Sequence, residues 1–362
     1  MKILFAGGGT AGHVEPALAV ARAWSEKYPA DEIVFLGTAV GLENSLVPAA
    51  GFKLLHIPKV TIARRLSPSL VLVPFQLLKS IVVTRQRLTE VDLAIGFGGY
   101  VSAPLYLAAR MRKVPYVIHE QNAKPGWANR LGARLTRYVA LSYSVNSPQF
   151  KGYEITGLPL RRDVKAALLS AEVDWSQARR AAKVRVSAKY DLNPELPLIF
   201  IFGGSQGSQV INQVIAQSKA LTHAHDMAVI HGIGKNNLLP EPGPQYRPLP
   251  YIEDMADCYL AADLLISRSG AVTCAEATAL SKYSLFIPLP IGNGEQALNA
   301  QSLIKAERAE IIEQASFTSQ WLEANLARLL ALASTRPMAG DNSGITAVDK
   351  IVAMMERALN QR

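Results

Sequence analysis

A glycine-rich turn between an apolar run and a helix-like run constrains this chain more than any other feature. The apolar run Ile3–Phe5 leads into a stretch with four glycines between residues 7 and 12, and His13 follows directly. A strand that ends in glycines and opens a helix brings backbone N–H groups and the positive helix end close to a bound anion. Three of the glycines satisfy the dinucleotide spacing G-x-G-x-x-G, which alone is a weak signal. We therefore predict a strand–turn–helix unit at a ligand site, with His13 beside the ligand.

The same motif occurs a second time. The apolar run Leu198–Phe202 leads into the glycine turn Gly203–Ser208 and then into a helix-like run from Gln209. Around both turns, apolar runs alternate with amphipathic stretches, which predicts βαβ units and parallel sheets. We therefore expect an α/β chain of two doubly wound, Rossmann-like domains that face a cleft, with ligands at the carboxyl ends of the strands. The predicted strands are Ile3–Ala6, Ile33–Gly37, Lys53–Ile57, Asp92–Gly96, Tyr116–His119, Tyr138–Leu141, Leu198–Phe202, Ala228–His231, Asp263–Ser267 and Ser284–Ile287.

The domain boundary is predicted where the alternation loosens, near residues 152–159. A chain of 362 residues is long for one core and sufficient for two α/β domains. We place the first domain at residues 1–158 and the second at residues 162–340. The last amphipathic segment lies within residues 345–362, and the sequence leaves open whether it packs back onto the first domain.

The composition limits the class of protein. Hydrophobic residues make up 49% of the chain and charged residues 19%, which is typical of a globular protein. The two cysteines exclude a disulfide scaffold, and we expect them to be buried thiols of a reducing compartment. The first strand follows Met1 so closely that no signal peptide fits, and no apolar run is long enough to span a bilayer. We expect no metal and no cofactor, because the sequence has no D-x-D pair and no His/Cys cluster with ligand spacing.

The net charge of +9 calls for an anionic partner: nucleic acid, a membrane surface or a phosphorylated substrate. One segment, from Lys59 to Leu88, contains six basic residues and no acidic one, and its apolar residues follow helical spacing. A helix of this kind lies well on an anionic bilayer surface, although an ordinary helix docked on the sheet would fit equally well. Few aromatic residues interleave with the basic ones, which argues against nucleic acid. The basic residues are Lys59, Arg64, Arg65, Lys79, Arg85 and Arg87, and the apolar positions are Val71, Phe75, Leu78 and Val82, next to Leu70, Leu77 and Ile81.

His13 is the leading candidate for chemistry. A nicotinamide-binding domain needs an acidic residue at the end of its second strand to bind the ribose. Here that strand ends Phe35-Leu36-Gly37-Thr38, with no acidic residue, which argues against hydride transfer from a nicotinamide cofactor. The positive helix end disfavours imidazolium, so we expect His13 to be neutral near pH 7 and able to accept a proton. The alternative is a histidine satisfied by a local hydrogen bond at the helix start. We favour a general base that activates a hydroxyl.

The second half offers groups suited to a sugar nucleotide. Glu276 is expected about one and a half turns into the helix after the strand 263–267, where a carboxylate can accept both hydroxyls of a ribose; a surface glutamate is the alternative. The segment Gly292–Asn299 offers amide side chains, which suit the hydroxyls of a sugar. A third glycine turn, Gly96–Ser102, again lies between a strand and a helix. Together these features favour a phosphorylated, sugar-bearing ligand.

Taken together, these motifs resemble the MurG family of peptidoglycan glycosyltransferases, which add N-acetylglucosamine to a lipid-linked muramyl-pentapeptide. The resemblance covers almost the whole chain. The motifs that carry it are the first glycine turn with His13, Gly98–Ser102, His119–Asn122, Gly203–Gly207, and Arg268–Ala271 through Glu276. The departures from the family pattern are Ala11 for a glycine, Leu158 for an asparagine, Ala275 for a serine and Glu295 for a glutamine.

The resemblance implies a GT-B fold, with the sugar nucleotide on the second domain and the acceptor on the first, membrane-facing domain. It implies that the backbone around Ile252 contacts the uracil, that Glu276 contacts the ribose, and that Ser205 with neighbouring loop amides holds phosphate. It also makes His13 the leading candidate for the base. The substrate-binding residues that it implies are Thr10, Ala11, Gly12, Asn122, Arg161, Ser205, Gln206, Ile252, Ala271, Glu276, Gln296 and Asn299, of which Gln296 and Asn299 contact the sugar hydroxyls.

The function implied is an inverting transfer of N-acetylglucosamine from UDP-N-acetylglucosamine to the 4-hydroxyl of undecaprenyl-diphosphate-linked N-acetylmuramyl-pentapeptide, at the cytoplasmic face of the cell membrane. Two alternatives stay open. A UDP-sugar epimerase would share the architecture and the ribose contact, but it would need neither an acceptor nor a membrane surface. A non-catalytic peripheral membrane module would bind vesicles without turning over a nucleotide.

Overall fold

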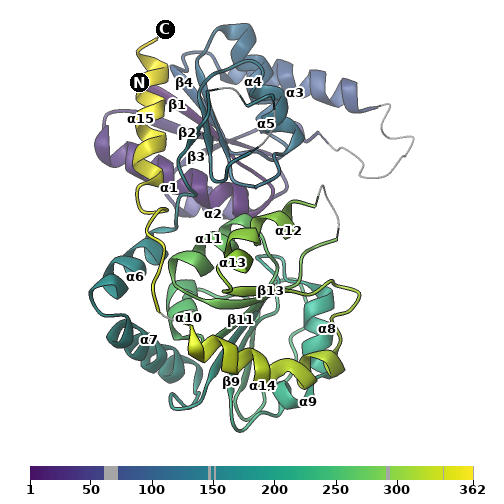
Figure 1. Ribbon diagram of the computed structural model, residues 1–362. Coiled ribbons are helices and arrows are strands. Elements are labelled where there is room, and N and C mark those ends of the chain that lie inside the picture. Colours follow the sequence, from purple (N-terminus) through teal and green to yellow (C-terminus); the bar gives the residue numbers. More distant parts are fainter. Residues whose placement is uncertain (61–71, 146–147, 151, 291–293, 337, 362) are drawn as a thin grey trace. The chain divides into compact units, whose positions relative to one another are not determined.

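The computed structural model describes residues 1–60, 72–145, 148–150, 152–290, 294–336 and 338–361. The chain divides into two compact units: unit 1 comprises Met1–Arg161 and Ser343–Arg362, and unit 2 comprises Arg162–Asn342. Each unit contains one sheet of parallel strands with helices packed against it (Figure 1). The predicted α/β fold with two doubly wound domains is therefore confirmed.

The seven-stranded sheet of unit 1 has the order β3-β2-β1-β4-β5-β6-β7. The strand order reverses at β1, because β2 and β3 lie on one side of it and β4 to β7 on the other. In sheets of this kind, ligands bind outside the carboxyl ends of the strands at the point of reversal. The strands are β1 (Lys2–Ala6), β2 (Glu32–Gly37), β3 (Lys53–His56), β4 (Leu93–Gly96), β5 (Tyr116–Glu120), β6 (Val139–Leu141) and β7 (Glu154–Ile155).

Successive residues of these strands enter two different cores. Phe5 and Phe35 stack with ring centroids 5.2 Å apart in the core that α1 covers. Leu4 and Leu36 point to the opposite core, which α4 covers. Because both faces of the sheet are buried, the strands appear in the sequence as continuous apolar runs. The helices of unit 1 are α1 (Ala11–Lys27), α2 (Glu43–Ala49), α3 (Val73–Arg87), α4 (Ser102–Arg112), α5 (Trp127–Gly132) and α15 (Ala347–Leu359).

The C-terminal helix α15 returns to unit 1 (yellow in Figure 1). It contacts α1, β4 and β5, and it buries Ile351 and Met355 completely in the same core as Phe5. At its polar edge, Glu356 accepts hydrogen bonds from Lys27 and Tyr28 at the end of α1. The last segment of the chain is therefore part of the first core.

The six-stranded sheet of unit 2 has the order β10-β9-β8-β11-β12-β13, with the reversal at β8. Helices α8 and α14 cover one face, while the ring of Tyr259 in α10 meets Phe200 and Phe202 of β8 edge-on at the other. The strands are β8 (Leu198–Phe202), β9 (Ala228–Gly232), β10 (Tyr246–Leu249), β11 (Leu264–Ser267), β12 (Tyr283–Phe286) and β13 (Ala309–Ile311). The helices are α6 (Arg162–Val173), α7 (Trp175–Tyr190), α8 (Gln209–Gln217), α9 (Lys219–Thr222), α10 (Met255–Ala261), α11 (Ala271–Ala279), α12 (Glu295–Asn299), α13 (Gln301–Lys305) and α14 (Ser319–Thr335).

All ten predicted strands are present, and their ends differ from the predicted ones by at most one residue. Three further strands, β7, β10 and β13, were not predicted. Both cysteines are buried thiols, as expected. Within the described parts of the chain, no helix combines the length and the apolar character needed to cross a bilayer. Residues 61–71 of the predicted basic segment lie outside the described residues, and with them the named positions Arg64, Arg65, Leu70 and Val71.

Candidate active site

In unit 1, two glycine turns meet at the carboxyl edge of the sheet, where the strand order reverses. One turn follows β1 and the other follows β4, and these strands are neighbours. Gly9 has a φ of 94° and Gly99 a φ of 82°, values that strongly favour glycine. A Cβ on Gly99 would collide with the carbonyl oxygen of Gly8, and one on Gly9 would lie 3.2 Å from Tyr100 Cε2. The missing side chains therefore let the two turns pack backbone against backbone.

His13 lies against both turns. It is the third residue of α1, and its N–H donates to the Thr10 carbonyl oxygen at 3.1 Å. Its Nδ1 lies 2.9 Å from Thr10 Oγ1. On the other side, a Cβ on Gly98 would lie 3.0 Å from His13 Cδ2 and 3.2 Å from Nε2. The ring is thus held between Thr10 and the glycine turn after β4.

The environment of His13 favours the neutral imidazole. Burial lowers the pKa of His13 to about 4, while the nearby Glu43 carboxylate acts in the opposite direction. When Nδ1–H donates to Thr10 Oγ1, the free lone pair is on Nε2, the nitrogen next to Gly98. The local hydrogen bond expected under the alternative interpretation is therefore present, and it leaves the second ring nitrogen able to accept a proton.

The segment after β5 is organised around a buried carboxylate. Glu120, 2% exposed, accepts hydrogen bonds from the backbone N–H and the side-chain amide of Asn122 at 2.9 and 3.2 Å. It also accepts from Gly126 N–H at 2.9 Å and from Asn129 Nδ2 at 3.0 Å. Burial raises the pKa of Glu120, and these hydrogen bonds oppose the rise. Asn122 is therefore held in one orientation at the same sheet edge as His13.

The structure brings together some predicted residues of unit 1 and adds one. Thr10, Ala11, Gly12 and His13 form the continuous start of α1. Gln121, which was not predicted to bind substrate, has its Nε2 only 3.8 Å from where a Cβ on Gly12 would lie. Its place in the His119–Asn122 motif was the one sequence signal for it. Arg161 lies apart in the chain, directly before α6, as the last residue of the first stretch of unit 1.

In unit 2, the turn after β8 exposes its backbone. Gly204 has a φ of 93°, and nothing lies within 4 Å of the place where its Cβ would be. Ser205 is half-buried and Gln206 is exposed. The Gln206 carbonyl oxygen accepts a hydrogen bond from Asn237 Nδ2 at 2.9 Å, which holds the turn in place. At its end, Ser208 Oγ caps α8 by accepting from Ile211 N–H. The turn therefore offers a helix N-terminus and open backbone, as a phosphate site requires.

Arg268, at the end of β11, braces this turn. The residue is 8% exposed, and its guanidinium donates to Ser208 Oγ at 2.8 Å and to Gln314 Oε1 at 2.7 Å. It also donates to the carbonyl oxygens of Ile287 and Pro288 after β12. Burial lowers its pKa from the usual value. The residue was identified in the sequence only as part of a motif, because its partners lie 19 to 60 residues away in the chain.

The other predicted residues of unit 2 lie around the same sheet edge. Ile252 packs on Gly232 at the end of β9, where a Cβ would lie 3.0 Å from Ile252 Cγ1. Ala271 opens α11, and Glu276 lies one and a half turns into that helix with 1% of its surface exposed. Asn299 Nδ2 reaches the Ser269 carbonyl oxygen at 3.4 Å.

Gln296 is attached to the segment after β12, because its Oε1 accepts from Leu289 N–H at 2.9 Å. This contact brings α12 back to the end of the strand. Gly292 and Asn293, in the predicted amide segment, lie outside the described residues. In the described part of the chain, no three His, Cys, Asp or Glu side chains gather in a way that could hold a metal ion.

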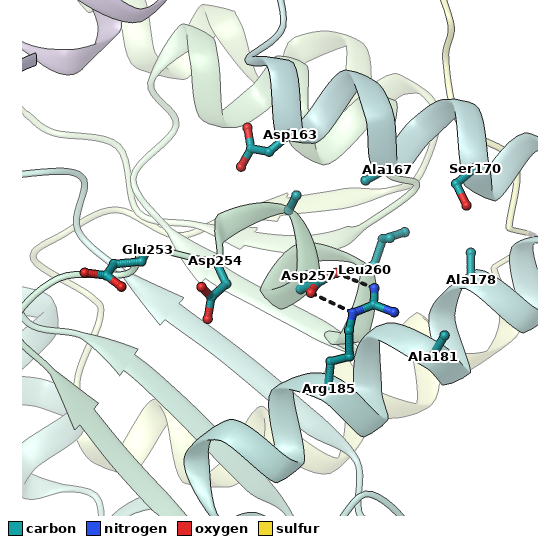
Figure 2. Close-up of a pocket in the computed structure, with 11 residues that line it drawn as sticks. Asp163, Ala167, Ser170, Ala178, Ala181, Arg185, Glu253, Asp254, Asp257 and Leu260 are labelled. Atoms are coloured by element: carbon teal, nitrogen blue, oxygen red, sulfur yellow. Dashed lines mark hydrogen bonds and ion pairs between the residues drawn. The ribbon is translucent and has the colours of Figure 1, made fainter. Parts of the chain in front are cut away.

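A cavity of about 460 Å³ in unit 2 lies between α6, α7 and α10 (Figure 2). Its charged lining consists of Asp163, Glu253, Asp254, Asp257 and one cation, Arg185. Asp257 already forms a bidentate ion pair with Arg185, with Nη2 at 2.6 Å from Oδ1 and Nε at 2.9 Å from Oδ2. The lining includes none of the predicted site residues. Its excess of carboxylates makes the cavity unsuitable for a diphosphate.

Comparisons with known proteins identify both halves of the chain. The model of the glycosyltransferase family 28 N-terminal domain matches residues 3–141, and that of the glycosyltransferase family 28 C-terminal domain matches residues 198–353. A protein of Streptomyces avermitilis is 41% identical over 91% of this chain and 90% of its own length. One of Corynebacterium glutamicum is 44% identical over 89% of this chain and 87% of its own length. Both are named UDP-N-acetylglucosamine–N-acetylmuramyl-(pentapeptide) pyrophosphoryl-undecaprenol N-acetylglucosamine transferase.

Among solved structures, the MurG protein of Acinetobacter baumannii matches 97% of this chain and 99% of its own, with a TM-score of 0.67 and 27% identity. The calicheamicin glycosyltransferase CalG4 matches 99% of this chain and 94% of its own, with a TM-score of 0.60 and 14% identity, which speaks for the fold alone. The fold is that of the GT-B glycosyltransferases.

Proposed function

The chain belongs to glycosyltransferase family 28, and from this premise we propose that it transfers N-acetylglucosamine from UDP-N-acetylglucosamine to undecaprenyl-diphosphate-linked N-acetylmuramyl-pentapeptide, converting lipid I to lipid II in peptidoglycan synthesis. The observation that carries the proposal is the agreement over nine tenths of the chain with transferases named for this reaction. Such a role makes the chain an enzyme of cell wall biogenesis, and through it of cell shape and division.

The proposed reaction is an inverting displacement. The 4-hydroxyl oxygen of the muramyl residue attacks C1 of N-acetylglucosamine from the face opposite the nucleotide. The bond from C1 to the diphosphate oxygen breaks, and UDP leaves with its electron pair. His13 Nε2 takes the hydroxyl proton. A neutral imidazole whose other nitrogen is held by Thr10 suits this task, because the base must be unprotonated at the moment of attack.

We assign the donor to unit 2. The open turn at Gly204–Gln206 and the N-terminus of α8 suit the diphosphate, where backbone N–H groups stabilise the charge that develops on departing UDP. The side chain of Ser205 adds a hydroxyl group at this turn. Ala271 is the first residue of α11, so it contributes its backbone at the N-terminus of that helix. Ile252 would contact the uracil and Glu276 the ribose hydroxyls. Gln296 and Asn299 would contact the sugar, because both amides are held at the same sheet edge.

We assign the acceptor to unit 1. Thr10, Ala11 and Gly12 line the start of α1 beside His13, and the amide of Asn122 is fixed by Glu120. Arg161 would supply a positive charge for the diphosphate that carries the lipid. Polar groups that are already oriented lose little entropy when the acceptor binds.

Transfer of labelled sugar tests this function. The protein is incubated with labelled UDP-N-acetylglucosamine, with and without the lipid-linked muramyl-peptide. We expect label in a β-linked disaccharide-lipid only when acceptor is present. An isomerised UDP-sugar formed without acceptor would instead identify an epimerase. Vesicle binding without any turnover of nucleotide would identify a non-catalytic module.

We also propose that α3 brings unit 1 to the anionic cytoplasmic face of the membrane. Four large apolar side chains form one stripe along this helix and its N-cap, and they are 50 to 69% exposed. Ser80 and Thr84 of the same helix are fully buried, and α3 packs against α4. Exposed Lys79, Arg85 and Arg87 lie on the same helix. An apolar stripe with basic flanks is typical of helices that lie in a bilayer interface. The stripe consists of Leu72, Phe75, Leu78 and Val82.

Vesicle sedimentation tests this surface. We expect the protein to bind vesicles with an anionic lipid, and a Phe75→Ser, Leu78→Ser variant to bind them about 10-fold more weakly, because two exposed apolar side chains that enter the bilayer interface on binding are lost. Val173→Ser is the matched control, since Val173 is 87% exposed on α6 of unit 2. Unchanged binding of the double variant would rule out α3 as the membrane surface.

A further inference from the structure

The glycine turn of unit 1 contains a carboxylate that the sequence motif does not reveal. Glu43 is the first residue of α2, and none of its surface is exposed. Its Oε2 accepts a hydrogen bond from Gly9 N–H at 2.8 Å. Its Oε1 accepts from Thr38 N–H at 3.1 Å, at the end of β2. One side chain therefore joins the turn after β1 to the turn after β2.

The surrounding backbone is shaped to admit this carboxylate. A Cβ on Gly8 would lie 3.0 Å from Glu43 Oε1, and one on Gly37 would lie 2.7 Å from Glu43 Cγ. A Cβ on Gly41 would collide with the carboxylate. The absence of side chains at Gly8, Gly37 and Gly41 therefore leaves room for the side chain of Glu43.

A short path of hydrogen bonds and one peptide bond leads from this carboxylate to His13. Gly9 precedes Thr10, and Thr10 holds His13 twice, through its carbonyl oxygen and through Oγ1. Gly9 adopts a φ of 94°, which a glycine reaches easily and equally easily leaves. The hydrogen bond from Gly9 to Glu43 fixes that torsion, and with it the place of Thr10.

The two contacts require a carboxylate in particular. Both oxygens of Glu43 accept from backbone N–H groups, and an ionised carboxylate is an acceptor at both oxygens. A glutamine would accept at one oxygen and turn an NH₂ donor toward the other N–H. The Glu43 charge also acts on His13 by raising the pKa of its imidazole against the effect of burial.

We propose that Glu43 is a positioning residue of the transferase: by holding Gly9 and Thr38, it sets the glycine turn and keeps His13 Nε2 where it can take the proton of the acceptor hydroxyl. The proposal rests on the proposed function, because it assigns Glu43 a role in the chemistry of His13. Glu43 itself touches no substrate. A misplacement of about 1 Å at a reacting group can cost about 100-fold in rate.

The test compares Glu43→Gln with Glu356→Gln. Glu356 is the matched control, because it braces the opposite end of the same helix, α1, through Lys27 and Tyr28. We expect Glu43→Gln to lower kcat about 10- to 100-fold, with the KM for UDP-N-acetylglucosamine and the affinity for UDP within about twofold of wild type. Glu356→Gln should leave kcat within about twofold of wild type. A Glu43→Gln variant that is folded, binds UDP and keeps its full kcat would overturn the proposal.

A second measurement does not depend on activity or on the folding of a variant. In the wild-type protein, we expect the backbone amide of Gly9 to exchange with solvent at least about 100-fold more slowly than an unprotected amide, because it donates to a buried carboxylate. Fast exchange at Gly9 would contradict the proposed contact. If the wild-type protein transfers no sugar while Gly9 is protected, the proposed function fails and the contact itself stands.

Discussion

Three histidines of this chain have pKa values far below the usual 6.5, and they differ in what holds their rings. His231 has Tyr246 OH at 3.0 Å from Nδ1 and Asn212 Oδ1 at 3.2 Å from Nε2, so neutral side chains engage both nitrogens. His119 Nε2 lies 3.3 Å from the Gly157 carbonyl oxygen, and none of the surface of His119 is exposed, so a substrate hydroxyl cannot reach its ring. In His13, Nδ1 meets Thr10 and Nε2 lies beside a glycine. Of the three, His13 has the environment of a base.

The low pKa of His13 predicts a flat pH dependence near neutrality. A base with a pKa of about 4 is unprotonated throughout the physiological range. The rate constant kcat/KM for the acceptor should therefore lose the contribution of this base only as the pH falls toward 4. A pH–rate profile checks this. An acid limb near 6.5, absent in a His13 variant, would show that the imidazole is not held as described.

The buried His231 predicts a loss of stability in acid. Its pKa is about 3 in the folded protein against 6.5 as the usual value, because burial disfavours the charged ring. Between these values the unfolded chain binds more protons, so stability is complete above about pH 6.5 and declines as the pH falls. Urea unfolding at several pH values should show this decline, and a His231→Gln variant should show a shallower one. Equal slopes in both proteins would contradict the assignment.

Glu276 predicts an effect on the donor alone. Glu276→Gln should raise the KM for UDP-N-acetylglucosamine about 10-fold, because one charged acceptor of the ribose hydroxyls is lost. Saturation kinetics measure this directly. Glu172→Gln, an exposed carboxylate of α6, is the control. A Glu276 variant with an unchanged donor KM and an unchanged UDP affinity would remove the residue from the donor site.

At the scale of single residues, the sequence predicts the features that depend on neighbours in the chain. The place of His13 at the helix start follows from its neighbours in the chain. Its neutral state was predicted from the positive helix end, whereas in the structure burial lowers the pKa of the imidazole, which lies against the turn after β4. Glu43 escapes prediction because the Gly9 N–H that it binds is 34 residues away. Only the pairing of β1 with β2 brings the two turns together.

At the scale of elements, the unpredicted strands share one property. β7, β10 and β13 are all edge strands. An edge strand has one neighbour and one row of unpaired backbone groups, so it needs fewer apolar residues and tolerates proline, such as Pro248 in β10. The central strands are buried on both faces, and their apolar runs made them predictable.

The buried face of helix α3 was likewise not predictable from the sequence. Helical spacing predicted two adjoining apolar strips but not which one would be covered. The structure packs Ile81 toward the core and leaves Phe75, Leu78 and Val82 exposed. The choice depends on α4, the neighbour of α3 in space.

The C-terminal helix predicts that the chain end stabilises unit 1. Ile351→Ala should lower the free energy of unfolding by about 2 to 5 kcal/mol, because it removes a fully buried side chain from the core shared with Phe5. Lys350→Ala, at an exposed position of the same helix, is the control. Urea unfolding measures both variants. A loss below about 0.5 kcal/mol for Ile351→Ala would mean that α15 is not part of the core.

At the scale of the whole molecule, we propose that the same motif serves two different tasks. Both units have a sheet with the order reversed at its first strand and a glycine turn at that point. In unit 2 the turn is open at Gly204, as a diphosphate site requires. In unit 1 the glycines instead pack against a second turn, around His13 and Glu43. We therefore propose that unit 2 binds the donor and that unit 1 supplies the base.

Turnover and UDP affinity of His13→Ala test this separation most directly. We expect kcat to fall about 10²- to 10⁴-fold, since a general base is lost, and the dissociation constant of UDP to stay within about twofold of wild type. His225→Ala, an exposed histidine of unit 2, should change neither value. Wild-type turnover by His13→Ala, or a loss of UDP binding equal to its loss of turnover, would contradict the account.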